Sequence, residues 1–447
     1  MADVSSLLQN IQSMIQPASN TSSTSNASNK SSTSNEIVEK QIKILVVSTH
    51  INQVNGYSKV AWNLIQQLAT NPWLSLVHFG TQKMVNADLG RAYPAGVKVI
   101  DASEKDKEKS PGFAFAELPT VIQAEKPDVV FIYNDLSVVC SYVEHIRKAI
   151  DVRPFRIWAY VDLTYSAPPT AFIDILNRDV ERVFCFTKGW KGVLKTSGIT
   201  RPVDVLPHAA SEILRPIPKD LARQQLGLPK DVFLFLSMNK NIPRKRLDLL
   251  VISFVKLMVR FPTRNIFMLI VADKGDHGGF SLFDIFAREI KLHGGTVDMF
   301  GNRLMITSKD TCYKDEDINM LYNCADACVS TAEGEGFGLC TFEPMSLGVP
   351  QIVPETLGYS EYCTTDNSLM VKPTMRAYLP SAYGAVTGEV QWVNPEDVSK
   401  AMERYVFDDD TRKLHARLGK EKTAEFTWSG IASVLVKRLR VIQDEDE

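Results

Sequence analysis

Residues 333–350 read EGEGFGLCTFEPMSLGVP and are the most informative stretch of the chain. The apolar run Ala327–Ser330 ahead of it predicts a buried strand, and Cys340–Leu347 within it predicts a helix. A glycine-rich turn between a strand and a helix leaves backbone N–H groups at the positive end of the helix dipole, where they attract anions. The stretch matches neither the GxGxxG pattern nor a P-loop, which disfavours dehydrogenases and P-loop hydrolases.

Two carboxylates in this stretch are eight positions apart. Glu335 lies in the glycine-rich loop, and Glu343 lies about two turns into the predicted helix. A carboxylate accepts hydrogen bonds from sugar hydroxyls, so the pair could hold a sugar and a ribose. At this spacing a structural alternative stays open, in which the glycines cap a strand–turn–helix corner and one glutamate is buried.

Working outward, strand-like and helix-like runs alternate along most of the chain. This pattern predicts an α/β protein with parallel sheets covered by helices on both faces. Two such series predict two doubly wound, Rossmann-like domains that face a cleft, over residues 41–215 and 216–428. Arg215–Asp220, which contains two prolines, is the predicted joint.

The ends and the composition of the chain narrow the class of protein. Of the 19 residues from 17 to 35, 15 are Ser, Thr or Asn, so we expect residues 1–40 to form a disordered tail. One helical face in Leu7–Ile15 leaves a docking or peripheral membrane contact open. A net charge of −2 disfavours nucleic-acid binding, and there is no apolar run long enough for a transmembrane segment. Seven cysteines in mostly apolar surroundings and the lack of a secretory signal predict a cytoplasmic protein with reduced thiols.

Positive charge is concentrated in one loop of the second predicted domain. Residues 239–246 read NKNIPRKR and follow a predicted strand. Cations at a helix N-terminus oppose the helix dipole, so an anionic ligand explains them better than a solvated helix start does. Lys240, Arg244 and Lys245 are therefore candidate ligands of a diphosphate.

These motifs together resemble glycosyltransferase family 4, whose members are retaining enzymes with the GT-B fold. The family signature has two glutamates separated by seven residues, with Phe-Gly after the first and Gly-x-Pro after the second. The matching positions are Glu335, Phe337, Gly338, Glu343, Gly348 and Pro350. Further matches are Asn55–Tyr57 at an acceptor-side loop, Leu206–Ala210 at the joint, Gly358–Glu361, and Phe426–Trp428 before a last helix (about 429–443) that crosses back to the first domain.

The resemblance implies a hexosyltransferase of glycan biosynthesis that moves a sugar from a nucleoside-diphosphate sugar to an acceptor hydroxyl. It implies catalytic roles for Glu335, Lys245 and Asp162. It implies substrate binding by Gly56, Lys240, Arg244, Gly336, Phe337, Gly338, Leu339, Glu343 and His208. No metal ion or other cofactor is expected. The chain departs from the family pattern at Asp162, where a His is frequent, and at His208, where an Asn is common.

Other functions stay open from the sequence alone. One is another GT-B reaction, such as epimerisation or phosphorolysis. The other is a catalytically weak protein that binds nucleotide sugars. The sugar, the base, the acceptor and the oligomeric state are not determined by the sequence, and residues 372–388 form an apparent insertion that could shape acceptor choice.

Overall fold

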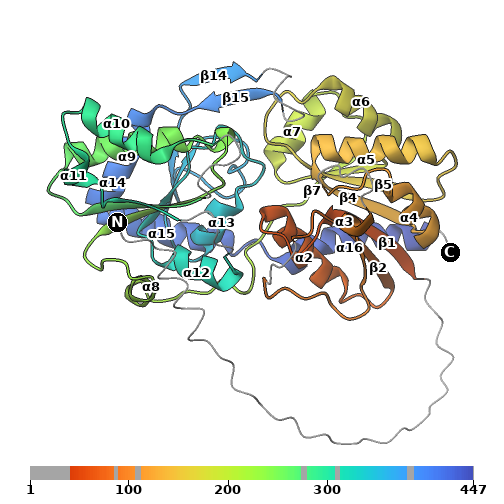
Figure 1. Cartoon of the computed structure of the whole chain (residues 1–447). Coiled ribbons are helices and arrows are strands. Elements are labelled where there is room, and N and C mark those ends of the chain that lie inside the picture. Colours follow the sequence, from red (N-terminus) through yellow and green to blue (C-terminus); the bar gives the residue numbers. More distant parts are fainter. Residues whose placement is uncertain are drawn as a thin grey trace, which may run out of the picture.

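The computed structural model describes residues 41–84, 89–105, 112–272, 279–307, 313–379 and 387–445. The predicted tail of residues 1–40 lies outside them. Within the described residues the chain forms two lobes, each built on its own parallel sheet (Figure 1).

The first lobe contains a seven-stranded parallel sheet in the order β3-β2-β1-β4-β5-β6-β7. Its strands are almost entirely buried, as expected for a sheet covered by helices on both faces. The strands are β1 (Ile42–Thr49), β2 (Leu74–Thr81), β3 (Lys98–Asp101), β4 (Val129–Asp135), β5 (Arg156–Asp162), β6 (Arg182–Cys185) and β7 (Val203–Val205). The helices are α2 (Gly56–Leu68), α3 (Ala102–Lys105), α4 (Leu118–Glu125), α5 (Leu136–Ala149), α6 (Thr170–Asp179) and α7 (Lys188–Thr196).

The second lobe contains a six-stranded parallel sheet in the order β10-β9-β8-β11-β12-β13. Its strands are β8 (Phe233–Met238), β9 (Ile266–Val271), β10 (Leu304–Ile306), β11 (Ala327–Val329), β12 (Gln351–Pro354) and β13 (Leu369–Val371). Its helices are α8 (Lys219–Gln225), α9 (Leu247–Arg260), α10 (Leu282–Leu292), α11 (Val297–Phe300), α12 (Asp315–Asn323), α13 (Leu339–Ser346), α14 (Pro395–Phe407) and α15 (Asp409–Thr423), with a 3₁₀ turn, η1 (Pro243–Lys245), ahead of α9.

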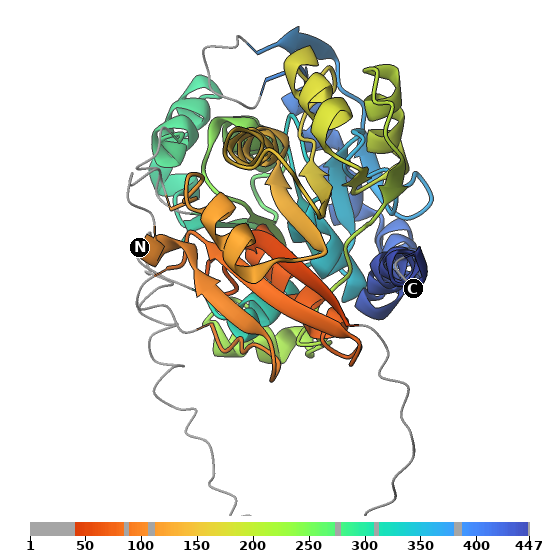
Figure 2. The same ribbon diagram turned by 90° about the vertical axis from the view of Figure 1, so that its right-hand side faces the viewer.

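Two elements connect the lobes. The last helix, α16 (Trp428–Glu445), returns to the first lobe and packs against α2 (Figure 1). An antiparallel hairpin of β14 (Met375–Tyr378) and β15 (Glu389–Trp392) extends from the second lobe to the first. We call this hairpin the arm. Figure 2 shows the molecule turned by 90°, with the blue C-terminal helix against the first lobe.

The strand order determines where ligands can bind. In the first sheet the order reverses between β1 and β4, and in the second between β8 and β11. A doubly wound sheet binds its ligands at the carboxyl ends of its strands beside this reversal. The loops there carry Gly56 and Asp135 in the first lobe, and residues 239–245 and 330–338 in the second.

The sequence predicted bounds for eleven of the strands and for the helices α2, α9, α10, α12, α13 and α16, and these agree with the structure to within two residues at each end. It placed Lys245 inside the helix that follows β8, whereas α9 begins at Leu247 because Arg246 has a φ of 49° and interrupts the helix. The sequence also missed β3, β13 and the hairpin of the arm, which are short strands of three or four residues. Such short strands have too few positions for a periodic pattern.

Three further properties concern only the part of the chain that the structure describes. None of its helices is long and apolar enough to cross a membrane. It contains no group of three His, Cys, Asp or Glu side chains arranged to hold a metal ion. Six of the seven cysteines lie in it, and all six are free thiols, in keeping with the reduced state expected from the sequence.

Candidate active site

The glycine-rich loop lies between β11 and α13 and touches the first lobe. A Cβ atom on Gly336 would lie 1.9 Å from Asp162 Oδ1, so only glycine permits this approach. The carbonyl oxygen of Gly336 accepts a hydrogen bond from Trp190 Nε1 at 2.8 Å. Gly338 has a φ of 85° and precedes the first residue of α13, Leu339, a backbone shape that favours glycine. The loop is thus held between the two lobes.

Two of the three predicted cations meet Glu335. Lys245 Nζ forms an ion pair with Glu335 Oε2, and Arg244 Nη1 lies 3.4 Å from the same oxygen. Burial raises the pKa of Glu335, but Lys245 and Arg244 outweigh it and hold the pKa below its ordinary value. Lys240 is exposed at the end of β8 and is not among the residues that contact Glu335. Of the three predicted diphosphate ligands, the structure thus brings Arg244 and Lys245 together at Glu335.

Glu343 is buried in α13 and already has partners in both lobes. Its carboxylate oxygens lie 2.8 and 3.0 Å from Lys59 Nζ of α2. Tyr322 donates a further hydrogen bond to it at 2.8 Å. A carboxylate offers about four lone pairs, so Glu343 can accept roughly one further hydrogen bond in this state.

A second ion pair joins the lobes next to this one. Arg91 lies 2.9 Å from each carboxylate oxygen of Asp315 through Nε and Nη2, and both side chains are only 3% exposed. Asp315 is the first residue of α12, where a carboxylate interacts favourably with the positive end of the helix dipole. Its side chain also pairs with Arg91 and so helps hold the two lobes together. Lys59 Nζ, at 3.7 Å from Asp315 Oδ1, links the two pairs.

Asp162 lies at the carboxyl end of β5 beside a second carboxylate that sequence reasoning missed. Tyr57 Oη is 2.8 Å from Asp135 Oδ1 and 2.7 Å from Asp162 Oδ2. A tyrosine hydroxyl has one proton to donate, so the trio is fully hydrogen-bonded only when one carboxyl keeps its proton. In agreement, burial and then the Asp135 charge raise the pKa of Asp162 to about 7. One signal was available: Asp135 ends the strand next to β5 in the sheet, as Asp162 ends β5.

The side chains of His208 and Phe337 lie in an aromatic core. Their ring centroids are 4.8 Å apart, and Phe186 lies 4.4 Å from His208. Neither ring nitrogen of His208 has a hydrogen-bond partner, and burial lowers its pKa to about 3. The geometry favours packing roles for both side chains, which leaves only their backbone to face a ligand.

The starts of α2 and α13 face each other across the lobes. A Cβ atom on Gly56, the first residue of α2, would lie 3.4 Å from Leu339 Cδ1. Helix N-termini carry partial positive charge and favour anions. Together with Arg244 and Lys245, these two helix N-termini bring positive charge to the contact between the lobes.

The chain is similar in sequence to curated glycosyltransferases. The chain is 26% identical over 240 residues, 49% of its length, to the lipopolysaccharide core biosynthesis mannosyltransferase LpsB of Rhizobium meliloti, covering 65% of that protein. It is 21% identical over 231 residues, 52% of its length, to a D-inositol 3-phosphate glycosyltransferase of Streptosporangium roseum, covering 47% of that protein. The chain thus spans about half to two thirds of the length of these curated relatives. No protein-family model matches the chain.

The solved structures show the architecture. Sucrose-phosphate synthase of Thermosynechococcus elongatus superimposes with a TM-score of 0.66 at 16% identity, over 90% of this chain and 99% of that one. Anabaena HepE in complex with UDP and glucose gives 0.64 at 14% identity, over 90% and 100%. The chain has the GT-B fold. The GT-B arrangement of two facing Rossmann-like units expected from the sequence is confirmed.

Proposed function

We propose that this GT-B protein is a retaining glycosyltransferase of the hexosyltransferase class. The second lobe would bind a nucleoside-diphosphate sugar, and the first lobe would present an acceptor hydroxyl. The similarity to curated glycosyltransferases supports this proposal, as do the GT-B neighbours. We also propose a cytoplasmic location and no metal requirement, and we place the domain boundaries near residues 215 and 428.

The observation that carries the proposal is the cluster of Arg244, Lys245 and Glu335. All three lie at the carboxyl edge of the second sheet, and Asp162 of the first lobe lies against the adjacent Gly336. The two cations would bind the diphosphate of a nucleotide sugar, and the carboxylate would accept hydrogen bonds from the hydroxyls of its sugar. Without a ligand, the negative charge of Glu335 balances part of the positive charge of Arg244 and Lys245. The three buried side chains can therefore stay ionised.

The proposed chemistry assigns one task to each group. The bond between the sugar C1 and the diphosphate oxygen breaks, and Lys245 and Arg244 stabilise the negative charge that develops on the leaving group. Glu335 orients hydroxyls of the transferred sugar. The acceptor oxygen bonds to C1 on the face that the diphosphate leaves, and the departing diphosphate helps take the acceptor proton, as the family resemblance implies. Asp162, at the end of β5 in the first lobe and against Gly336 of the second, would lie next to both reacting partners.

One observation favours a second function, that of a catalytically weak nucleotide-sugar-binding protein. Both carboxylates of the glutamate motif are occupied by lysines, Glu335 by Lys245 and Glu343 by Lys59. A ligand must compete with these contacts, which costs binding energy. Turnover separates the two functions.

The test begins with binding. Thermal unfolding is followed with UDP, GDP and ADP, because a ligand at 100 times its Kd adds about 2.7 kcal/mol of stability. UDP-glucose and GDP-mannose are then tested for release of nucleotide, with and without sugar acceptors. Proton NMR of the product gives the anomeric configuration, and inversion would overturn the retaining mechanism. Loss of turnover in EDTA that Mg²⁺ restores would contradict metal independence.

A further inference from the structure

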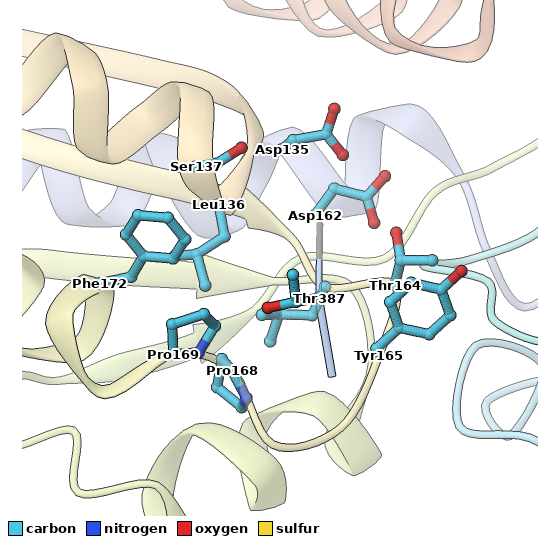
Figure 3. Close-up of a pocket in the computed structure, with 11 residues that line it drawn as sticks. Asp135, Leu136, Ser137, Asp162, Thr164, Tyr165, Pro168, Pro169, Phe172 and Thr387 are labelled. Atoms are coloured by element: carbon cyan, nitrogen blue, oxygen red, sulfur yellow. The ribbon is translucent and has the colours of Figure 1, made fainter. Parts of the chain in front are cut away.

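A small cavity in the first lobe lies beside the proposed reaction centre. It is found at the carboxyl ends of β4 and β5 and is lined in part by Asp162, the residue that also lies against Gly336 of the glycine-rich loop. Figure 3 shows Asp135 and Asp162 side by side at this cavity. Its volume is about 30 Å³, room for one end of a ligand, such as a single hydroxymethyl group. A group held here would be next to Gly336 and hence to the transferred sugar.

One wall of the cavity comes from the other lobe, through the arm. Thr387 lines the cavity just ahead of β15. The arm is joined to the first lobe there, because Glu389 N donates to Ser166 O at 3.0 Å as part of an antiparallel bridge. Gly388 has a φ of 148°, and a Cβ on it would lie 2.4 Å from Ser166 O. The position of Thr387 is therefore fixed by close backbone contact.

A buried carboxylate anchors the base of the arm. Glu333 accepts hydrogen bonds from Tyr165 Oη of the first lobe, at 3.0 Å, and from Trp392 Nε1 of the arm. Arg246 lies 3.7 Å from the same carboxylate and 5.0 Å from the Trp392 ring centre. Glu333 is also the first residue of the glycine-rich loop. This one carboxylate therefore links that loop to the arm and to Tyr165, which lines the cavity.

The cavity has acidic and hydroxyl groups but no cation among the described residues that line it. Asp135 and Asp162 supply carboxylates, and Ser137, Thr164 and Thr387 supply hydroxyls. Even with a proton shared through Tyr57, the acidic pair keeps at least one negative charge. The positive charge of Arg244 partly opposes the raised pKa of Asp135 and Asp162, but Arg244 also faces Glu335 together with Lys245, and both would serve a donor diphosphate.

We propose that this cavity is the acceptor subsite, that it takes an uncharged polyhydroxylated acceptor in preference to a phosphorylated one, and that Thr387 of the arm helps determine this specificity. Carboxylates and hydroxyls bind sugar or cyclitol hydroxyls well, whereas a phosphate brought against two carboxylates is repelled. The inference rests on the proposed glycosyl transfer and names its acceptor class.

The first test compares matched acceptors. D-glucose and D-glucose 6-phosphate, D-mannose and D-mannose 6-phosphate, and myo-inositol and myo-inositol 1-phosphate are offered in separate series with UDP-glucose and GDP-mannose. For each pair we expect kcat/KM to be at least about tenfold higher with the neutral compound, because like charges would oppose the phosphate. Equal or higher values for the phosphorylated compounds overturn the inference.

The second test changes the charge of the cavity wall. Thr387→Arg should raise kcat/KM for the phosphorylated member of a pair relative to its neutral partner by about fivefold or more, and Thr387→Gln should leave that ratio within about twofold. Thr387→Lys repeats the test with a more flexible cation in case the arginine disturbs folding. An unchanged ratio in both cationic variants overturns the role of Thr387.

The outcomes also separate this inference from the function on which it rests. Each compound is measured both as an acceptor and as an inhibitor of nucleotide-sugar hydrolysis. If nucleotide sugars bind but no neutral compound accepts sugar or inhibits, the acceptor class is wrong and the donor site stands. If neither nucleoside diphosphates nor their sugars bind, the proposed function itself fails.

Discussion

At the scale of single residues, Glu335 and Glu343 have the same chemistry and different surroundings. Glu335 faces two cations in the second lobe, whereas Glu343 is bonded to Lys59 of the first lobe and to Tyr322. Sequence spacing alone suggested two ligand-binding carboxylates. The structure gives Glu343 a structural contact in addition, so the two residues should respond differently to substitution.

Glu335→Gln should lower turnover and spare affinity for the free nucleoside diphosphate. The amide loses charged hydrogen bonds to sugar hydroxyls, worth about 1.5–3 kcal/mol, or roughly 10–100-fold in rate. The diphosphate has no sugar to lose, and Lys245 and Arg244 remain to bind it. Steady-state kinetics and calorimetry with UDP and GDP measure the two effects. Glu361→Gln, on a neighbouring segment whose carboxylate accepts from Lys188 N, is the control. A parallel loss of diphosphate affinity would remove Glu335 from the sugar subsite.

His208 should make the protein less stable in mild acid. Its pKa is lowered to about 3 in the folded state, so between pH 6.5 and 3 the unfolded chain binds a proton that the folded protein does not. The protein therefore becomes less stable as the pH is lowered from 6.5 to 3. His208→Phe, which keeps an aromatic ring, should remove up to about 1.4 kcal/mol per pH unit from that slope. Urea unfolding from pH 7 to 4 measures it, with the exposed His293→Gln as control. A slope equal to that of the wild type would show that His208 does not stay neutral.

At the scale of elements, the glycine-rich loop is shaped by what lies opposite it. Its strand and helix follow local pattern, but the loop needs glycine at position 336 because Asp162 of the other lobe occupies the space of a side chain. The arm is placed in the same way, by Ser166 and Glu333 rather than by its own sequence.

Gly336→Ala should separate the loop from Asp162 and lower turnover by at least about tenfold, since displacement by an ångström near the reacting groups is costly. Gly192→Ala is the matched control, because Gly192 lies in α7 and a Cβ atom added to it would have no neighbour within 4 Å. There alanine should add up to about 1 kcal/mol of stability and leave turnover unchanged. Kinetics and thermal unfolding of both variants measure these effects. Wild-type turnover in Gly336→Ala would show that the contact with Asp162 is dispensable.

At the scale of the whole molecule, buried ion pairs hold the two lobes together. Lys59–Glu343 and Arg91–Asp315 both cross between them, and burial gives their loss a high cost. The GT-B architecture places the proposed donor and acceptor sites on opposite sides of this interface. The relative position of the lobes therefore affects both binding and chemistry.

Arg91→Met should destabilise the ligand-free protein by about 3–5 kcal/mol, because it leaves Asp315 buried without its main partner. The same variant should increase the radius of gyration measured by small-angle X-ray scattering if the pair keeps the lobes closed. Arg417→Met is the control: its partner Glu421 and Arg417 itself are 58% and 60% exposed, and such pairs contribute about 0–1 kcal/mol. Unchanged stability and size in Arg91→Met would show that the lobes do not depend on this contact.

The sequence by itself determined the alternation of strands and helices, the glycine-rich turn with Glu335 in it, and the concentration of positive charge in residues 239–246. These follow from contiguous residues, because periodicity, backbone freedom at glycine and charge near a helix start are local properties. The GT-B resemblance added the expectation that the two loops belong to one site.

Only the tertiary structure decided which side chains meet across the lobes. Lys59 and Glu343 are 284 positions apart, Arg91 and Asp315 are 224 apart, and Tyr165 and Glu333 are 168 apart. Nothing local marks these partners, because their contact depends on how two separately folded sheets face each other. Tertiary packing also sets the raised pKa of Asp162, through burial and the neighbouring Asp135, and it places Thr387 of the arm against the first lobe.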